Sequence, residues 1–269
     1  MKTQKMTARD AAFQQFETLR RNREKRTKQR LFFLEGVHPT EHAIDGGWHF
    51  RAMGVPMGKR LSGWAEDMVR RAAPDTLYEI EPALHAELSD REEPCEILSL
   101  VEERSDGLAR IARAENPFFV LFDRPQSPGN LGTVIRTADS FGASAVFTTG
   151  HGADFYDPQC IRASVGTMFR LPFHAFQSAE ETVSHLQTLP AMPKLVGTSA
   201  RGEELLSETD LTMPLMLLIG NEATGLSRTW KDRADALCRI PICGSASSLN
   251  AACAASIAMY EVAQQRNFR

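Results

Sequence analysis

Apolar residues occur along this chain mainly in short runs, and longer stretches of mixed polarity separate those runs. In the second half, the separating stretches look like amphipathic helices, so strands and helices alternate. This alternation predicts an α/β fold with a mostly parallel sheet whose faces are covered. The predicted strands of this half are residues 118–123, 144–150, 194–200, 215–220 and 237–242.

The first half repeats the pattern on a smaller scale and predicts a small α/β unit, again with a mostly parallel sheet. Its predicted strands are residues 31–36, 50–56 and 95–103, and its predicted helices are residues 39–44 and 62–72. Residues 105–115 are polar and poor in bulky side chains, which is typical of a linker. The sequence therefore predicts a domain at residues 1–105, a linker at 106–115 and a second domain at 116–269.

The residues that follow each strand of the second domain are candidates for a binding site, because ligands of such sheets bind beyond the carboxyl ends of the strands. These segments are residues 123–130, 198–201, 220–225 and 242–250. Asn130 is placed to cap the helix that follows it, and Glu222 lies on a glycine-flanked turn. A capping Asn and a solvated Glu are the alternative interpretation.

The stretch from residue 237 to residue 257 combines a strand, a loop of small residues and an alanine-rich helix. Pro241 indicates an edge or the end of the strand, and Ser247 or Ser248 is expected to cap the helix. Leu249, Cys253 and Ile257 recur every four residues, so one face of the helix is apolar. Such an arrangement suits a ligand with an adenine ring, and the alternative is a buried helix after an ordinary turn.

Composition narrows the class of protein. With 42% hydrophobic and 24% charged residues, the chain reads as a soluble globular protein. The first thirty residues are charged throughout and no long apolar run follows, which predicts no signal peptide, no membrane partner and a cytoplasmic location. Five scattered cysteines form no CxxC pair, so we expect reduced thiols and no metal site.

The charges are distributed unevenly along the chain. Residues 1–30 hold ten Lys and Arg against three Asp and Glu, whereas residues 75–106 hold eleven acidic residues against two arginines. The densest basic run, residues 20–30, predicts an arm that contacts nucleic-acid phosphates through Arg21, Arg23, Lys25 and Arg26. A solvated helical arm without a partner is the alternative.

Two common nucleotide-binding motifs are missing. The first predicted strand of the second domain is followed by Gly129-Asn-Leu-Gly132 and not by GxGxxG, and the chain has no GxxxxGK[ST]. Neither a dinucleotide-binding fold nor a P-loop is therefore predicted.

Three segments together resemble the motifs of the SpoU/TrmH ribose 2′-O-methyltransferases, in the SPOUT superfamily. They are NLGTVIRTADSFGA, LIGNEATGLS and IPICGSASSLNAACAASIAMYE, in the family's order. The N-terminal half resembles the ribosomal-protein-like substrate-binding domain of many members, through the basic run, LFFLEGVHPTEHAI and LSDREEPCEILSLVEE.

The resemblance implies a deep C-terminal trefoil knot, a homodimer with the active site at the subunit interface, and S-adenosylmethionine as the cofactor. Carried over position by position, the residues that hold the cofactor or lie near it are Gly220, Ile240, Leu249, Thr198 and Ser199. The residues on active-site positions are Asn130, Arg136, Glu222, Ser248 and Asn250.

The implied reaction is methyl transfer to a ribose 2′-hydroxyl, with ribosomal RNA favoured over transfer RNA. In the family, the residue at the position of Arg136 has been proposed as the base, but a guanidinium stays protonated, so a phosphate clamp is the other interpretation. Two other classes of function stay open: an RNA-binding protein without catalysis, and an α/β enzyme that acts on a small molecule.

Overall fold

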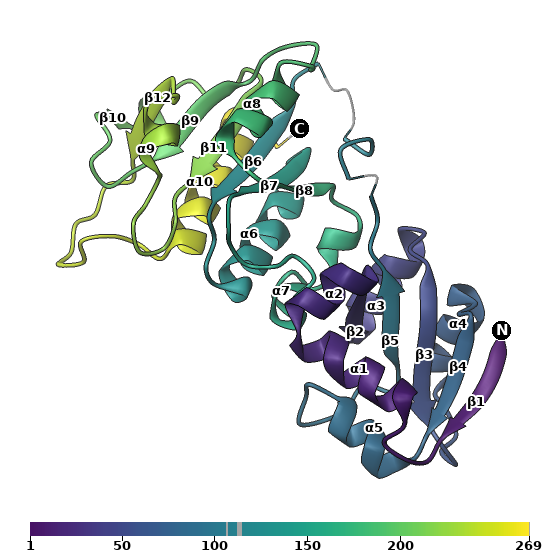
Figure 1. Cartoon of the computed structure of the whole chain (residues 1–269). Helices are drawn as coiled ribbons and strands as arrows, with labels where there is room; N and C mark the ends of the chain where they lie inside the picture. The colour runs from purple at the N-terminus through teal and green to yellow at the C-terminus, as the bar shows by residue number, and fades with distance from the viewer. Residues whose placement is uncertain (106, 112–114, 269) are drawn as a thin grey trace. The chain divides into compact units, whose positions relative to one another are not determined.

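The computed structural model describes residues 1–105, 107–111 and 115–268, and these form two compact units (Figure 1). Met1–Ser105 and Asp154–Arg170 make up the first unit, and Asp106–Ala153 and Leu171–Arg269 make up the second. Part of the predicted linker, residues 106 and 112–114, lies outside the described residues. The domain boundaries stay a prediction, with one difference: residues 154–170 were expected in the second domain and pack within the first.

The first unit is built on a mixed sheet of strand order β1-β4-β3-β5-β2. Strands β1, β4 and β3 are parallel, whereas β5 is antiparallel to both β3 and β2, so the expectation of a mostly parallel sheet was wrong for this unit. Strand β1 was missed because KTQKM contains one apolar residue, and β4 was missed because TLYEI is a short run with polar residues at Thr76 and Glu79. The elements are β1 Lys2–Met6, α1 Ala11–Arg21, α2 Arg23–Gln29, β2 Leu31–Glu35, α3 Val37–Asp45, β3 Phe50–Pro56, α4 Gly63–Ala72, β4 Thr76–Ile80, α5 Pro82–Leu88, β5 Leu98–Glu102, α7 Pro158–Ala163 and η1 Thr167–Phe169.

An aromatic cluster explains why residues 154–170 belong to the first unit. Phe32 of β2 stacks on Tyr156 and on Phe169, with ring centroids 4.6 and 5.8 Å apart. Trp48 adds an edge-to-face contact with Phe169 and donates its indole N–H to the carbonyl oxygen of that residue at 3.0 Å. Residues 154–170 therefore complete the hydrophobic core of the first unit.

The second unit contains a seven-stranded sheet of order β10-β12-β9-β11-β6-β7-β8, in which all neighbouring strands are parallel. The predicted α/β class with a parallel sheet is confirmed. The elements are β6 Phe118–Asp123, α6 Pro128–Ser140, β7 Ala145–Thr149, β8 Phe173–Phe176, α8 Ala179–Leu186, β9 Lys194–Thr198, β10 Glu204–Leu205, η2 Leu206–Glu208, β11 Leu215–Ile219, α9 Arg228–Lys231, β12 Ala236–Arg239 and α10 Ala251–Gln265.

Both faces of this sheet are covered by helices (Figure 1). On one face, Phe119 and Leu121 of β6 pack with Leu186 of α8 and Trp230 of α9. Helices α6 and α10 pack together, with α10 also against β9 and β11. The Oγ atoms of Thr137 in α6 and Ser256 in α10 lie 3.2 Å apart. Burial on both sides explains why these strands are continuous apolar runs without alternation.

The two helices nearest the candidate site begin differently from the expectation. Ser127 caps α6 by accepting from the N–H of Asn130, so Asn130 lies in the first turn and is not the cap. Asn250, and neither Ser247 nor Ser248, caps α10 by accepting from two backbone N–H groups. Strand β12 ends at Arg239, two residues before the strand-breaking Pro241. The trefoil knot implied by the resemblance stays a prediction.

Candidate active site

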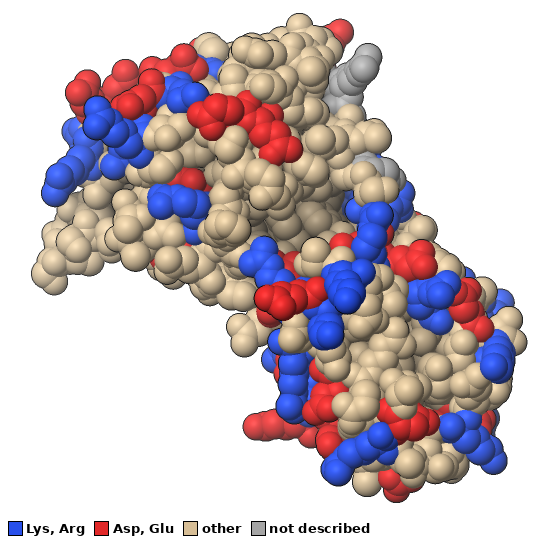
Figure 2. Space-filling view, viewed as in Figure 1, with Lys and Arg blue, Asp and Glu red and all other residues tan. Residues whose placement is uncertain are grey.

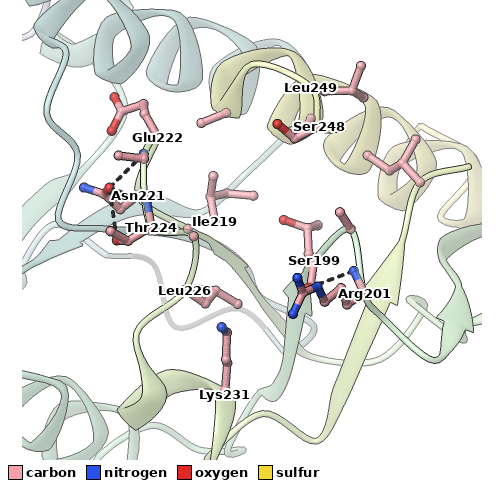
Figure 3. A pocket seen from close by; sticks show the side chains of 18 of the residues that line it. Ser199, Arg201, Ile219, Asn221, Glu222, Thr224, Leu226, Lys231, Ser248 and Leu249 are labelled. Carbon is pink, nitrogen blue, oxygen red and sulfur yellow. Dashed lines mark hydrogen bonds between the residues drawn. The ribbon is translucent and has the colours of Figure 1, made fainter. Parts of the chain in front are cut away.

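A cavity of about 400 Å³ lies in the second unit, lined by the segments that follow β9, β11 and β12 (Figure 3). Strands β12, β9, β11 and β6 are consecutive in the sheet, so the loops at their carboxyl ends meet at one edge. The volume falls within the range of small-molecule sites, roughly 300–1,000 Å³.

All five residues expected at the cofactor line this cavity: Thr198, Ser199, Gly220, Ile240 and Leu249. Two of the five expected active-site residues, Glu222 and Ser248, line it as well (Figure 3). Three segments distant in sequence therefore meet at one cavity, as the positions carried over from the family required.

Glu222, Asn130 and Asn250 form one chain of hydrogen bonds. The side-chain amide of Asn130 donates to Glu222 Oε1 at 3.1 Å, and its Oδ1 accepts from Asn250 Nδ2 at 3.3 Å. Glu222 also accepts from the backbone N–H groups of Gln126 at 2.9 Å and Ser127 at 3.0 Å. This chain joins the turn after β11 to the first turn of α6 and to the cap of α10.

The Glu222 carboxylate is stabilised in its charged form. Partial burial acts to raise the pKa of Glu222, but the N–H donors of Gln126 and Ser127 and the amide of Asn130 together outweigh burial and lower it. A carboxylate that is saturated with donors and has a lowered pKa is a weak proton acceptor. Glu222 is therefore suited to hold charge and geometry at the edge of the cavity and not to act as a general base.

The turn after β11 is fixed by Asn221, which is buried. Its Oδ1 accepts from the N–H groups of Ala223 and Thr224 at 2.9 and 3.0 Å, and its Nδ2 donates to the carbonyl of Arg124 at 2.7 Å. A β-carbon at Gly220 would collide with the backbone of Gly225 and its neighbour. Gly220 is therefore required by the turn itself, whatever ligand the cavity holds.

Asp123, at the end of β6, anchors the far side of the same turn. It accepts from the N–H of Ser227 at 2.8 Å and from the Thr149 hydroxyl at 3.1 Å, and it pairs with Arg124 at 3.2 Å. Sequence reasoning had singled out the region after β6 but had given no role to Asp123 or Asn221. Their positions directly after strand ends were the available signal.

Arg136 is not joined to the hydrogen-bonded chain. It lies on the exposed side of α6, six residues beyond Asn130 and therefore nearly two helical turns away. Arg136 is exposed within the second unit, so its side chain is accessible to a partner molecule.

The basic run at residues 20–30 is part of the folded first unit and not a free arm. Helix α1 buries Phe13, Phe16 and Leu19, and Arg20 donates to the carbonyls of Glu87 and Leu88 at 3.1 and 2.9 Å. The expectation of a projecting arm was wrong, because the apolar positions of α1 are at helical spacing and bury one face.

Arg26 is the clearest correction among the expected RNA-binding residues. Its side chain is only 2% exposed and pairs with Asp154 at 2.9 Å and Asp157 at 3.4 Å. It also donates to the carbonyl of Leu19 at 3.0 Å. A guanidinium committed to two carboxylates and a carbonyl inside the unit does not reach RNA phosphates. Arg21, Arg23 and Lys25 are exposed.

The described residues contain neither a candidate metal site nor a candidate membrane-spanning helix. In the parts of the chain that the structure describes, no group of three or more His, Cys, Asp or Glu side chains is placed to hold a metal ion. No helix within the same residues is both long and apolar enough to cross a membrane.

Sequence profiles identify both units. The SpoU rRNA Methylase family matches residues 117–260, and the SpoU L30e-like domain matches residues 10–99. A 23S rRNA (uridine(2479)-2′-O)-methyltransferase of Streptomyces viridochromogenes is 41% identical over 266 residues, which cover 97% of this chain and 92% of the relative. A 23S rRNA (guanosine(2553)-2′-O)-methyltransferase of Bacillus subtilis is 27% identical over 241 residues, 89% of this chain and 91% of the relative.

Solved structures agree with the profiles. The crystal structure of the SpoU methyltransferase AviRb from Streptomyces viridochromogenes, in complex with AdoMet, is similar with a TM-score of 0.89 and 41% identity, covering 96% of this chain and 99% of that one. An AdoMet-bound rRNA methyltransferase from Sinorhizobium meliloti has a TM-score of 0.87 at 27% identity, with 97% and 98% covered. The expected class of enzyme, an RNA ribose 2′-O-methyltransferase that uses S-adenosylmethionine, is confirmed. The chain belongs to the SpoU rRNA methylase family.

Proposed function

We propose that this enzyme methylates the ribose 2′-hydroxyl of a uridine in 23S rRNA. The relative that is 41% identical over nearly the whole chain is named for a uridine, whereas the relatives named for a guanosine are 27–34% identical. The similarity to the uridine enzyme covers both units, and so does the similarity to two guanosine enzymes, so the higher identity is what favours uridine. Transfer RNA, the alternative substrate, is less favoured because these relatives, matched over nearly the whole chain, are all named for 23S rRNA.

The cavity fits S-adenosylmethionine in size and in the chemistry of its walls. Thr198, Gly220 and Ile240 present backbone groups that follow strand ends, and Leu249 supplies an apolar wall. Backbone N–H and C=O groups can read the edge of an adenine ring, while the apolar wall can cover its face. When bound, the cofactor supplies an electrophilic methyl group on a positively charged sulfur.

The residues around the cavity act mainly by positioning. A ribose hydroxyl is a weak acid, so it needs an acceptor for its hydrogen bond and a fixed approach as it attacks. Glu222 fixes Asn130, and Asn130 in turn fixes Asn250, so three polar side chains hold one geometry. We assign Asn130 and Asn250 to orienting the ribose and Ser248 to the mouth of the cavity.

Arg136 is proposed as a phosphate clamp and not as the base. An arginine side chain stays protonated in proteins, and its planar fork suits two phosphate oxygens. Its exposure on α6 is what a residue that binds RNA requires. Proton loss from the ribose hydroxyl is then left to solvent around the phosphate.

A homodimer is proposed from an uncovered apolar face on α10. Ile257 and Tyr260 of α10 are 43% and 48% exposed, Cys253 lies on the same face, and Leu249, just before the helix, is 38% exposed. The opposite face of α10, with Ala252, Ala255, Ala258, Met259 and Val262, is buried in the unit. An apolar face that the single chain leaves in water favours a second copy. We further propose that the enzyme acts in the cytoplasm, where rRNA is available to it.

RNA docking by the first unit is proposed to involve Arg21, Arg23 and Lys25, without Arg26. On the face of this unit that Figure 2 shows, lysine and arginine side chains are interspersed with acidic ones, so charge outlines no single basic surface there. We therefore expect these residues to contact phosphates and not to read bases.

The observation that carries this proposal is the meeting of all five expected cofactor residues and Glu222 at one cavity. Comparing 2′-O-methylation across 23S rRNA from cells with and without the gene tests it. Loss of methylation at one uridine is expected. If every 23S site is unchanged and a transfer RNA nucleotide loses its methyl group, the assigned substrate is wrong.

A further inference from the structure

The cavity is lined by two cationic side chains that lie outside the family motifs. Arg201 follows β9 and Lys231 ends α9, and both are exposed residues at the cavity wall (Figure 3). Figure 3 shows them on the side of the cavity away from Glu222. Within the described residues, neither side chain forms an ion pair, so both charges are available to a ligand.

The backbones that carry these two residues are fixed. The Ser199 hydroxyl accepts from the N–H of Arg201 at 3.2 Å, and Gly202 donates to the carbonyl of Ser199 at 3.0 Å. A β-carbon at Gly202 would collide with the backbone of β12, which holds this turn against the sheet. Lys231 follows Trp230, which is 1% exposed and donates to the Thr149 hydroxyl at 3.2 Å.

The two ends of the cavity therefore carry opposite charges. Glu222 is the only carboxylate among its lining residues, and three donors from Gln126, Ser127 and Asn130 hold it in place. Arg201 and Lys231 are the only cations among the same residues. Such a field orients a ligand that carries a positive and a negative group at different points.

We propose that Arg201 and Lys231 bind the carboxylate of the amino-acid part of S-adenosylmethionine. The inference rests on the proposed function, because that cofactor has one anionic group, its α-carboxylate, and two cationic groups, the α-ammonium beside it and the sulfonium. With the carboxylate at Arg201 and Lys231, the sulfonium is directed toward Glu222. Glu222 accepts from Asn130, and Asn130 accepts from Asn250, so this orientation would bring the sulfonium end of the cofactor nearest the residues assigned to the ribose.

Calorimetry on the full chain with two ligands tests this assignment. S-adenosylmethionine carries the carboxylate, whereas 5′-methylthioadenosine has the same adenosine and sulfur but lacks the amino-acid part. In Arg201→Met and in Lys231→Met, the Kd for S-adenosylmethionine should rise at least about tenfold, the scale of one charge-assisted hydrogen bond. The Kd for 5′-methylthioadenosine should stay unchanged, which also shows that each variant is folded.

Arg228→Met is the matched control, because Arg228 lies on the same short helix, is 93% exposed and does not line the cavity. Its affinity for both ligands should equal that of the wild type. Equal losses for both ligands in the Arg201 and Lys231 variants, or no loss for either, would overturn the assignment.

Measuring RNA affinity in the same variants distinguishes binding of the cofactor carboxylate from binding of RNA phosphates. Unchanged RNA affinity in both variants supports the proposal, whereas weakened RNA binding with intact cofactor affinity assigns the cations to phosphates and overturns it. Failure of the wild type to bind S-adenosylmethionine at all would overturn the proposed function itself, and the inference with it.

Discussion

The side-chain amide of Asn130 lies 3.1 Å from Glu222 Oε1 and donates to it, which ties the first turn of α6 to the turn after β11. The same Asn130 side chain accepts from Asn250. Asn130 is thus the central member of the chain, and its two neighbours contact each other through it.

Asn130→Ala should uncouple these residues. Single-turnover methylation should fall by at least about tenfold, corresponding to about 1.4 kcal/mol in the barrier, because Asn250 loses the group that orients it. Cofactor affinity should change little, since Asn130 does not line the cavity. Thr133→Ala, one turn further along the exposed side of α6, is the control and should keep full activity. Wild-type turnover in Asn130→Ala would remove the chain from the mechanism.

Asn250 has two roles that a pair of variants can separate. Asn250→Ser keeps an oxygen that can cap α10 but loses the amide that donates to Asn130. Asn250→Ala loses both, and the lost cap should cost about 1 kcal/mol of unfolding free energy. Thermal denaturation should show loss of stability mainly in the Ala variant, while activity assays should show lower turnover in both. Full activity in Asn250→Ser would restrict Asn250 to its capping role.

The parallel sheet and the cavity could be predicted from the sequence because their signals are local. Phe118–Asp123 and Leu215–Ile219 are apolar runs bounded by polar turns, and the residues after them carry the family motifs. Because ligands of such sheets bind beyond the strand ends, segments distant in sequence could be predicted to lie at one site.

What the sequence did not reveal depends on contacts between distant residues. The residues next to Arg26 in the sequence do not indicate that it pairs with Asp154 and Asp157, so this buried cation was predicted to belong to a basic arm. The positions of Leu249 and Ile257 show an apolar face, but not that the single chain leaves it exposed. Lys231 lies on a four-residue helix that is too short to give a periodic pattern.

Stability should depend on pH through Glu103. Burial, and then the nearby Asp154 carboxylate, raises the pKa of Glu103 from 4.5 to about 7, against the opposing effects of Arg30 and Arg26. Between these values the native state keeps a proton that the unfolded chain releases, so unfolding free energy should fall as pH rises from about 4.5 to 7. Above pH 7 this contribution should stay constant.

Glu103→Gln removes the titrating group, so its stability should decline less than that of the wild type over the same pH window. Thermal denaturation at a series of pH values measures this difference. Glu92→Gln, at an exposed position, is the control and should follow the wild type. Parallel curves for the wild type and Glu103→Gln would contradict the assignment.

The exposed face of α10 should decide the oligomeric state. Ile257→Asp places a charge in the middle of that face, where burial against a second copy would desolvate it. Sedimentation should show a dimer for the wild type and a monomer for the variant. Met192→Asp changes a residue of similar exposure, 48%, before β9, and should leave the dimer intact. A wild-type monomer, or a dimeric Ile257→Asp, would remove this face from assembly.

Methyl transfer to a ribose 2′-hydroxyl of 23S rRNA can be measured directly. Purified enzyme can be incubated with 23S rRNA and S-adenosylmethionine that carries an isotope label on its methyl group, followed by alkaline hydrolysis and mass spectrometry. A 2′-O-methyl group blocks cleavage of the adjacent phosphodiester, so we expect label in one alkali-resistant dinucleotide whose 5′ residue is a uridine. Label on a base, or no label in 23S rRNA, would contradict this expectation.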